Sequence, residues 1–214
     1  MSSAAIVCNG LFPRKEYPLD LLRSAGLVIC CDGALSALEK RGITPDVVIG
    51  DMDSVCSRAL ARFGGKVVKV GEQQTNDLSK AFRYLMDNMP EDLDSIHILA
   101  ATGRREDHAM GNLSLLADFQ LDPRVSGRGI SIDIVSDWST IIPVIESCSL
   151  FVGEGRSVSL ISTDPTLRIS SEGLQWPTDG VELDKWWKAT LNRAVSDRIS
   201  LTLSHPAPVL VILG

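Results

Sequence analysis

The chain has 214 residues, of which 44% are hydrophobic and 22% are charged, and this composition is ordinary for a globular protein of one large or two small domains. The formal net charge is −6 and no basic run exceeds two residues, which argues against a nucleic-acid-binding surface. No apolar stretch approaches the ~18 residues of a membrane span, no signal peptide opens the chain, and the five cysteines form no CxxC pair. We therefore expect a cytoplasmic protein with no disulfide framework, no zinc site and no membrane contact.

Strand and helix patterns alternate over the first part of the chain. Short apolar runs predict strands at 4–8, 27–31, 47–49, 67–70, 95–101 and 130–135. Amphipathic patterns between them predict helices at 18–24, 32–40, 54–63, 75–89 and 107–119. Apolar strands separated by helices imply a mostly parallel sheet with helices on both faces, so residues 1–136 are predicted to form an α/β domain.

The pattern changes after residue 137. Helical periodicity disappears apart from a possible turn at 184–188, and turn residues separate short apolar runs. These runs lie at 140–145, 157–161, 166–169, 199–203 and 209–213. Residues 137–214 are therefore predicted to form a smaller, sandwich-like all-β domain. Because such a module is small for burying its own core, we expect it to pack against the first domain, a second subunit, or both.

Two acids stand one residue apart behind the predicted strand 47–49. Along an extended backbone, residues two apart project the same way, so Asp51 and Asp53 could converge on one point. Two carboxylates in that place indicate a hard cation such as Mg²⁺. The alternative is a helix N-cap, in which Asp53 or Ser54 caps a helix starting at Val55. Capping explains one acid and a serine, but it leaves the second acid unexplained.

Further polar clusters follow the other predicted strands. Each has a local alternative: Asp32 could close a turn with Gly33, and Thr75 could cap a helix. Asp77 could be a first-turn acid favoured by the helix dipole, and Asp107 could cap the next helix. In an open α/β sheet, ligands bind beyond the carboxyl ends of the strands, so four clusters at that edge predict a site. The clusters lie at 32–33, 50–54, 72–77 and 102–108.

The predicted rim combines acids with two neighbouring arginines, Arg104 and Arg105. Carboxylates, Mg²⁺, arginine and free helix N-termini together make a polyphosphate site. The chain has neither a GxxxxGK[ST] loop nor a GxGxxG run, which excludes the P-loop and the dinucleotide fingerprint. These features indicate metal-assisted phosphoryl transfer or hydrolysis, and they leave the acceptor open.

Four motifs resemble those of thiamine pyrophosphokinases, in the same order and at the same spacing. GDMDS at 50–54 is similar to the GDxDS element, and Gln73 with TNDLSKA at 75–81 is similar to DQxxTDxxKA. GRREDH at 103–108 is similar to GGRxDH, and GLQW at 173–176 is similar to GLxW. The resemblance covers about residues 28 to 213, and the acidic motifs together are its most specific part.

The resemblance implies an enzyme that transfers diphosphate from ATP to the hydroxyethyl oxygen of thiamine and releases AMP. It implies that three acids organise Mg²⁺ and the phosphates and serve as catalytic residues and metal ligands: Asp51, Asp53 and Asp77. It implies ATP or phosphate contacts for five residues: Asp32, Gln73, Thr75, Arg105 and Asp107.

The resemblance also implies a homodimer. In the family, the active site lies between the α/β domain of one subunit and the β-sandwich of its partner, where the GLxW tryptophan packs on thiamine. Trp176 and Asn192 occupy the thiamine-binding positions of this sequence. An aromatic face suits thiamine because thiamine carries a permanent positive charge. The remaining tryptophans match no motif, and we expect them in a core or an interface; they are Trp138, Trp186 and Trp187.

The sequence departs from the family pattern at several positions. Ala34 replaces the second glycine of a DGG element, Glu72 replaces an aspartate, and Gln74 replaces a frequent acid. Arg104 stands where a glycine would let the backbone approach phosphate, so we expect Arg105 to handle the phosphates. Leu191 replaces a residue that is commonly polar.

Two other functions remain open at this point. A metal-dependent phosphohydrolase could use the same acids with water as the acceptor, although it has no evident need for Trp176. A non-catalytic regulator could bind thiamine or a nucleotide, although a pure binder has no need to keep mutually repelling acids such as Asp51, Asp53 and Asp77.

Overall fold

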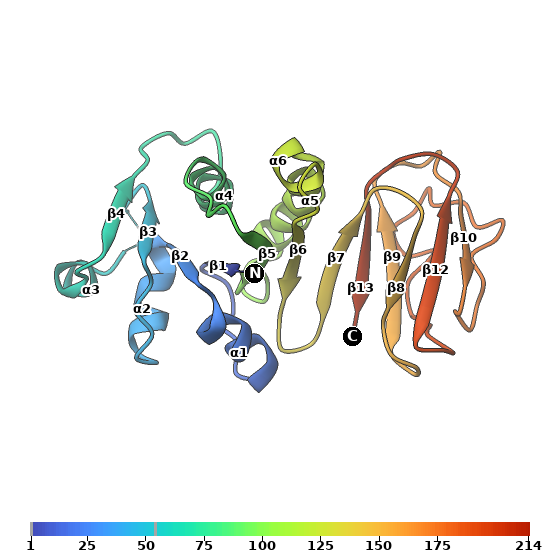
Figure 1. Cartoon of the computed structure of the whole chain (residues 1–214), viewed down its shortest axis with the longest axis horizontal. Coiled ribbons are helices and arrows are strands. Elements are labelled where there is room, and N and C mark those ends of the chain that lie inside the picture. Colours follow the sequence, from blue (N-terminus) through green and yellow to red (C-terminus); the bar gives the residue numbers. More distant parts are fainter. Residues whose placement is uncertain (1, 54) are drawn as a thin grey trace. The chain divides into compact units, whose positions relative to one another are not determined.

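The computed structural model describes residues 2–53 and 55–214, and the chain divides into two compact units (Figure 1). Unit 1 comprises Met1–Leu115 and Asp122–Asp137, and unit 2 comprises Leu116–Leu121 and Trp138–Gly214. Within the described ranges, no helix is long and apolar enough to cross a membrane.

The strands of unit 1 form a parallel sheet in the order β6-β5-β1-β2-β3-β4. Their bounds are β1 (Ser2–Val7), β2 (Leu27–Cys31), β3 (Val47–Gly50), β4 (Lys66–Lys69), β5 (Leu93–Leu99) and β6 (Ser131–Val135). In β1, Val7 pairs with Cys30 of β2 on one side and with Leu99 of β5 on the other. The winding of the chain therefore reverses between β1 and β5, which makes this the topological switch point of the sheet.

Helices cover both faces of this sheet, as the sequence predicted. Figure 1 shows α1 and α2 on one side of the strands and α4 on the other. The helical segments are α1 (Glu16–Ser24), the 3-10 turn η1 (Asp32–Ala34), α2 (Leu35–Glu39), α3 (Ser57–Arg62), α4 (Asp77–Asp87), α5 (Glu106–Leu121) and α6 (Pro123–Ser126).

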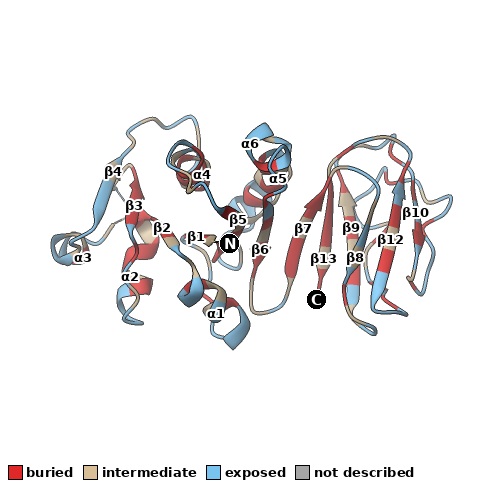
Figure 2. Cartoon of the chain, in the orientation of Figure 1, coloured by how far each residue is buried: buried red, intermediate tan, exposed pale blue. Residues whose placement is uncertain are grey.

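The core of unit 1 follows from the alternation of strand side chains. Val7, Cys30 and Val48 face the same way and pack in one cluster with Leu22 and Leu38 of the helices. Burial of each such aliphatic side chain stabilises the fold by about 1.5–3 kcal/mol. Figure 2 shows β2 and β3 largely buried, whereas the edge strand β4 is mostly exposed.

The opposite face of the sheet is covered by α4. Its apolar residues recur at helical spacing and are buried against β2 and β3. They are Leu78, Ala81, Phe82, Leu85 and Met86. The first turn of α4 is therefore held at a fixed position beyond the end of β3.

Several helix boundaries differ from the sequence prediction. Helix α3 begins only at Ser57, after an N-cap, Cys56, whose side chain makes no capping hydrogen bond. Asp53 therefore does not cap this helix, and the predicted cap Ser54 lies outside the described residues. At α4, the side chain of Asn76 accepts from the backbone N–H of Ser79 at 2.9 Å. Asn76, and not Thr75, is therefore the cap.

Unit 2 is a sandwich of two antiparallel sheets, which confirms the predicted fold class. The sheet orders are β11-β9-β13-β7 and β10-β12-β8. The strands are β7 (Thr140–Val144), β8 (Cys148–Phe151), β9 (Ser157–Ser162), β10 (Ile169–Glu172), β11 (Asn192–Arg193), β12 (Arg198–Leu203) and β13 (Val209–Leu213). Alternate residues of β9, β12 and β13 point inward, and Leu160, Leu201 and Val211 meet in one cluster.

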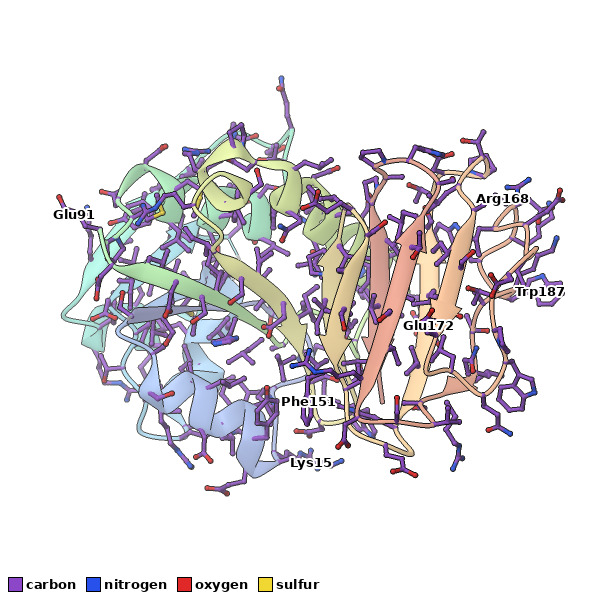
Figure 3. All side chains as sticks on the ribbon, turned by 45° about the vertical axis from the view of Figure 1, so that its right-hand side comes forward. Lys15, Glu91, Phe151, Arg168, Glu172 and Trp187 are labelled. Atoms are coloured by element: carbon purple, nitrogen blue, oxygen red, sulfur yellow. The ribbon has the colours of Figure 1, made fainter. Side chains whose placement is uncertain are left out.

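All four tryptophans are exposed, including the three that match no motif. Their exposed fractions are 64% for Trp138, 52% for Trp186 and 71% for Trp187, so the prediction of a core position was wrong. The ring of Trp187 stands out from the strands of unit 2 (Figure 3). Indole rings are costly to leave in water, so the interface alternative stays a prediction for these residues.

The Gly50→Ala substitution is expected to destabilise unit 1. A Cβ at position 50 would lie 2.6 Å from Cγ of Asp32, which is buried and cannot move aside without cost. We expect the free energy of unfolding, measured by chemical denaturation, to fall by about 1–3 kcal/mol. Gly64→Ala is the control, because a Cβ there meets nothing within 4 Å. Equal stability of the two variants would contradict the contact.

Candidate active site

A cavity of about 580 Å³ lies at the carboxyl ends of the unit 1 strands. Its walls come from the segments that follow β1, β3, β4 and β5, together with the start of α4. Asn9 follows β1, Asp51 follows β3 and Arg104 follows β5. Thr75 lies just before α4, and Asp77 is the first residue of α4. This is the edge at which open α/β sheets bind ligands.

Asp32 is a buried carboxylate beside this cavity. It is 1% exposed, and its Oδ2 accepts from the backbone N–H of Met52 at 2.8 Å. Its Oδ1 is buried and has no hydrogen-bond partner among the residues that the structure describes. Burial and then the negative charges of Asp77 and Asp51 raise the pKa of this carboxyl group. A buried, unsatisfied oxygen beside two more acids indicates a place where a cation or a proton belongs.

Met52 separates the two acids of the GDMDS motif and has a left-handed backbone, with φ at 70°. The argument that Asp51 and Asp53 project the same way assumed an extended backbone, so it does not apply here. Asp51 lines the cavity, and its Oδ1 accepts from the backbone N–H of Asp53 at 3.0 Å. Asp53 is exposed and is not part of the cavity wall. A left-handed residue other than glycine is a strain that often accompanies functional sites.

Two of the three predicted metal ligands, Asp51 and Asp77, line the cavity. Over residues 2–53 and 55–214, no group of three or more His, Cys, Asp or Glu side chains is close enough to hold a metal ion by itself. Mg²⁺ is commonly held by only one or two carboxylates together with water and substrate phosphates. The donor set around Asp32 therefore fits an ion that enters together with a polyphosphate.

Asp77 forms an ion pair with Lys80, which the sequence analysis did not single out. Lys80 Nζ lies 3.1 Å from Asp77 Oδ1, and the lysine side chain is only 3% exposed. The two residues are three apart on α4 and so share one face, which is the signal that could have revealed the pair. A buried ammonium needs such a partner, so Lys80 fixes Asp77 at the cavity wall.

Glu72 organises the segment between β4 and α4. Its Oε2 accepts from the backbone N–H groups of Gln74 at 2.8 Å and Thr75 at 3.1 Å. Its Oε1 accepts from the Thr75 hydroxyl and from Arg83 Nη2, the latter at 2.6 Å. Gln73 and Thr75, both predicted site residues, line the cavity on this tethered segment. Neither Glu72 nor Arg83 was predicted to have this role.

The two neighbouring arginines are held differently. Arg105 donates from Nε and Nη2 to the two carboxylate oxygens of Asp107, at 3.1 and 2.6 Å. This pairing lowers the pKa of Asp107 to about 2. Arg104 donates from Nη1 to the backbone oxygen of Asn9 at 3.1 Å and to its Oδ1 at 2.8 Å. Both arginines line the cavity, whereas Asp107 does not.

In unit 2, Asn192 holds the backbone of Trp176. The Asn192 Oδ1 accepts from the N–H of Trp176 at 3.2 Å, and its Nδ2 donates to the Trp176 oxygen at 2.6 Å. Oδ1 also accepts from the N–H of Arg193 at 2.8 Å. Asn192 is buried and Trp176 is 56% exposed. The Asn192 side-chain amide therefore bonds within the protein, whereas the indole of Trp176 is open to solvent.

Comparison with known proteins identifies the family. Residues 19–125 match the catalytic domain of thiamin pyrophosphokinase, and residues 140–209 match its substrate-binding domain. The chain belongs to the thiamin pyrophosphokinase family. Unit 1 therefore carries the family's catalytic domain, and unit 2 carries its substrate-binding domain.

Curated relatives of the chain include two rice proteins. Thiamine pyrophosphokinase 1 of Oryza sativa subsp. japonica is 28% identical in a match that covers 84% of this chain and 75% of the relative. Thiamine pyrophosphokinase 3 of the same organism is 26% identical in a match that covers 84% and 74%.

Solved thiamine pyrophosphokinases share the fold at lower identity. The enzyme from Bacillus subtilis superposes with a TM-score of 0.79 at 20% identity, covering 100% of this chain and 99% of that one. The enzyme from Candida albicans gives a TM-score of 0.78 at 15% identity, covering 99% and 88%. These similarities establish the fold of the chain.

The three acidic motifs on which the resemblance rests each contribute to one cavity in this chain. Asp51 of the first motif, Asp77 of the second and the arginines of the third all line it. Asp32 lies buried behind this wall, and Asp53 and Asp107 lie outside it. Trp176 and Asn192 belong to unit 2, in the family's substrate-binding domain.

Glu72 is expected to contribute to stability in a pH-dependent way. Its hydrogen bonds with Thr75 and Arg83 lower its pKa from 4.5 to about 2, so the folded state favours the ionised form. The contribution is therefore present above pH about 4.5 and is lost as the pH falls toward 2. We expect Glu72→Gln to lower the melting temperature at pH 7, and the difference from the unmodified chain to shrink across this range.

Glu91→Gln provides a matched control for this titration. Glu91 is exposed and points away from the chain (Figure 3), and its carboxylate has no hydrogen-bond partner within the described part of the chain. Its substitution removes the same charge without breaking a network. If both variants melt alike at every pH, the Glu72 tether does not stabilise the fold.

Proposed function

We propose that this chain is an ATP-dependent thiamine pyrophosphokinase, which transfers diphosphate from ATP to the thiamine hydroxyl and produces thiamine diphosphate and AMP. The observation that carries this proposal is the cavity of the catalytic domain, which brings Asp51 and Asp77 together with Arg104 and Arg105. Acids and guanidinium groups in one cavity suit a magnesium polyphosphate better than either charge alone would. The matching substrate-binding domain supports thiamine as the acceptor.

The residues of the phosphate side have distinct proposed roles. Asp51 and Asp77, which line the cavity, together with the exposed Asp53 would hold Mg²⁺, which when bound supplies charge neutralisation for the phosphates. Arg105, oriented by Asp107, would contact the phosphate chain. Phosphoryl transfer to a neutral alcohol needs alignment and charge neutralisation more than a strong base, so fixed side chains are the main requirement.

Four further residues complete this side of the site. Gln73 and Thr75 offer polar groups on the segment tethered by Glu72, and this tether limits the reorganisation needed on binding. Asp32, held by the backbone N–H of Met52, has a buried oxygen that lacks a protein partner in the described part of the chain. We propose that this oxygen is satisfied only when the nucleotide and its ion are present.

The acceptor side rests on Trp176. Its indole is exposed, and its backbone is held by Asn192, so the ring is presented at a defined place. An indole face attracts the positive charge of thiamine by a cation–π interaction, worth about 0.5–2 kcal/mol. We propose that Trp176 reaches the active site of a partner subunit in a homodimer, so that Asn192 acts on thiamine through Trp176.

One assay distinguishes this function from its alternatives. The protein is incubated with ATP, Mg²⁺ and thiamine, and the products are separated. Thiamine diphosphate with AMP supports the kinase. ADP with free phosphate, independent of thiamine, would indicate a phosphohydrolase, and no turnover despite binding would indicate a regulator.

Asp51→Asn and Asp77→Asn are expected to differ in stability although both lose activity. Each removes a carboxylate from the cavity, so turnover should fall by orders of magnitude in both. Asp51→Asn keeps an oxygen that can accept from the Asp53 N–H, so its melting temperature should stay near that of the unmodified chain. Asp77→Asn leaves the buried Lys80 without a counter-charge, so it should also destabilise the fold.

Steady-state turnover and thermal melting of the two variants test this expectation. Near-normal turnover in Asp51→Asn would contradict the metal-site assignment. An unchanged melting temperature in Asp77→Asn would show that Lys80 does not need this partner.

Trp176→Ala is expected to raise the Michaelis constant for thiamine by about 2- to 30-fold, because the cation–π contact is lost. The Michaelis constant for ATP, which binds in the other domain, should change little. Trp187→Ala serves as the control, since it removes another exposed indole of the same unit. A matching rise in both variants would indicate a general effect on unit 2 and not a thiamine contact.

Mixing Asp51→Asn subunits with Trp176→Ala subunits tests the shared site. If the site is built across two subunits, each mixed dimer regains one intact copy, and activity should recover in part. No recovery despite demonstrated subunit exchange would mean that each chain completes its own site.

A further inference from the structure

The lysine and the two arginines of the cavity wall differ in how their charge is balanced. Lys80 is paired with Asp77 at 3.1 Å, and Arg105 is paired with Asp107 through two hydrogen bonds. Arg104 is the exception, since in the described part of the chain its guanidinium contacts no carboxylate. An anion entering the cavity therefore meets its least compensated positive charge at Arg104.

Asn9 fixes the guanidinium of Arg104 without neutralising it. Both of its acceptors, the backbone oxygen and Oδ1, are neutral, and both receive their hydrogen bond from Nη1. The Nε and Nη2 groups of Arg104 make no hydrogen bond to the described residues, so they stay available as donors. The side chain is thus oriented and still able to bind.

The segment that carries Asn9 is itself fixed. The N–H of Gly10 donates to the oxygen of Ala100 at 2.7 Å, and the N–H of Leu11 donates to the oxygen of Thr102 at 2.8 Å. These bonds tie the segment after β1 to the segment after β5, across the switch point of the sheet. Arg104 therefore spans two backbone segments that cannot easily move apart.

We propose that Arg104 is a phosphate-binding residue of this site, pre-oriented by Asn9. A guanidinium with two adjacent free donors matches two oxygens of a phosphate group. This inference rests on the proposed function, and it names a residue for the anionic part of the substrate. It ranks Arg104 above Arg105, which was expected to handle the phosphates, because Nε and Nη2 of Arg105 are already engaged by Asp107.

Equilibrium binding tests the proposal without turnover. Isothermal titration calorimetry with ATP and Mg²⁺, and separately with inorganic tripolyphosphate and Mg²⁺, is carried out in the absence of thiamine. Arg104→Ala should weaken binding of both anions by about tenfold or more, the effect of losing a charge-assisted hydrogen bond. Arg104→Lys should retain part of the affinity, and Arg105→Ala should lose less than Arg104→Ala.

Arg23→Ala is the charge-matched control. Arg23 belongs to α1, pairs with Glu16 and Asp20, and is not part of the cavity wall, yet its loss changes the net charge of unit 1 equally. Its affinity for both anions should stay unchanged. Thermal melting and circular dichroism of every variant verify that the fold is intact.

A double-mutant cycle tests the role of Asn9. Asn9→Ala should weaken anion binding in the unmodified chain, because Arg104 loses the hydrogen bond to Asn9 Oδ1 and keeps only the one to the backbone oxygen of residue 9. The same substitution should have no effect in the Arg104→Ala background, since nothing is left to orient. An equal loss in both backgrounds would show that Asn9 does not act through Arg104.

The outcomes separate this inference from the function on which it rests. If the unmodified chain binds both anions and Arg104→Ala binds them equally well, Arg104 does not contact phosphate, while the proposed function stands. If the unmodified chain binds neither anion, the proposed function fails and the inference fails with it.

Discussion

The parallel pairing of β1 with β2 on one side and β5 on the other is the constraint on which the site depends. Because all strands of unit 1 run the same way, the segments that follow them emerge at one edge. The segments after β1 and β5 meet at this reversal of winding, and they form the cavity wall together with the segments after β3 and β4 and the start of α4. Residues as far apart in sequence as Asn9 and Arg104 become neighbours for this reason alone.

The acids gathered at that edge repel one another, and only some of them are paired with a cationic side chain in the described part of the chain. Asp77 is balanced by Lys80, and Glu72 is balanced by Arg83. Asp32 accepts from the backbone N–H of Met52 at Oδ2 and is paired with no cation among the described residues, and burial raises its pKa. Gly50 makes this arrangement possible, because a larger residue would occupy the space of the Asp32 side chain. The acid without a cationic partner therefore lies buried beside the cavity, whereas the acids at the start of α4 and in the segment before it are neutralised by Lys80 and Arg83.

The extent to which the sequence predicted the structure varied with the origin of each signal. Strands such as β3 were evident because burial on both faces leaves an uninterrupted apolar run. Short strands escaped notice: β8 alternates between partial and full exposure, and β11 has only two residues. The ends of the predicted strands were enough to predict which residues lie near the site. The hydrogen-bond and ion-pair partners of these residues were not predictable in this way. Nothing in the pattern distinguishes Asn76 from Thr75 as the cap, or shows that Met52 adopts a left-handed backbone. Those choices are made by tertiary contacts.

The attachment of Trp176 has a consequence for how the acceptor site can change over time. The Asn192 side chain hydrogen-bonds the backbone N–H and oxygen of Trp176, and neither of these bonds involves the indole ring. The position of the backbone and the chemistry of the ring are thereby decoupled. A different side chain at position 176 would keep the same backbone hydrogen bonds to Asn192. Substitution there could therefore change which acceptor is recognised without changing the fold of the β-sandwich.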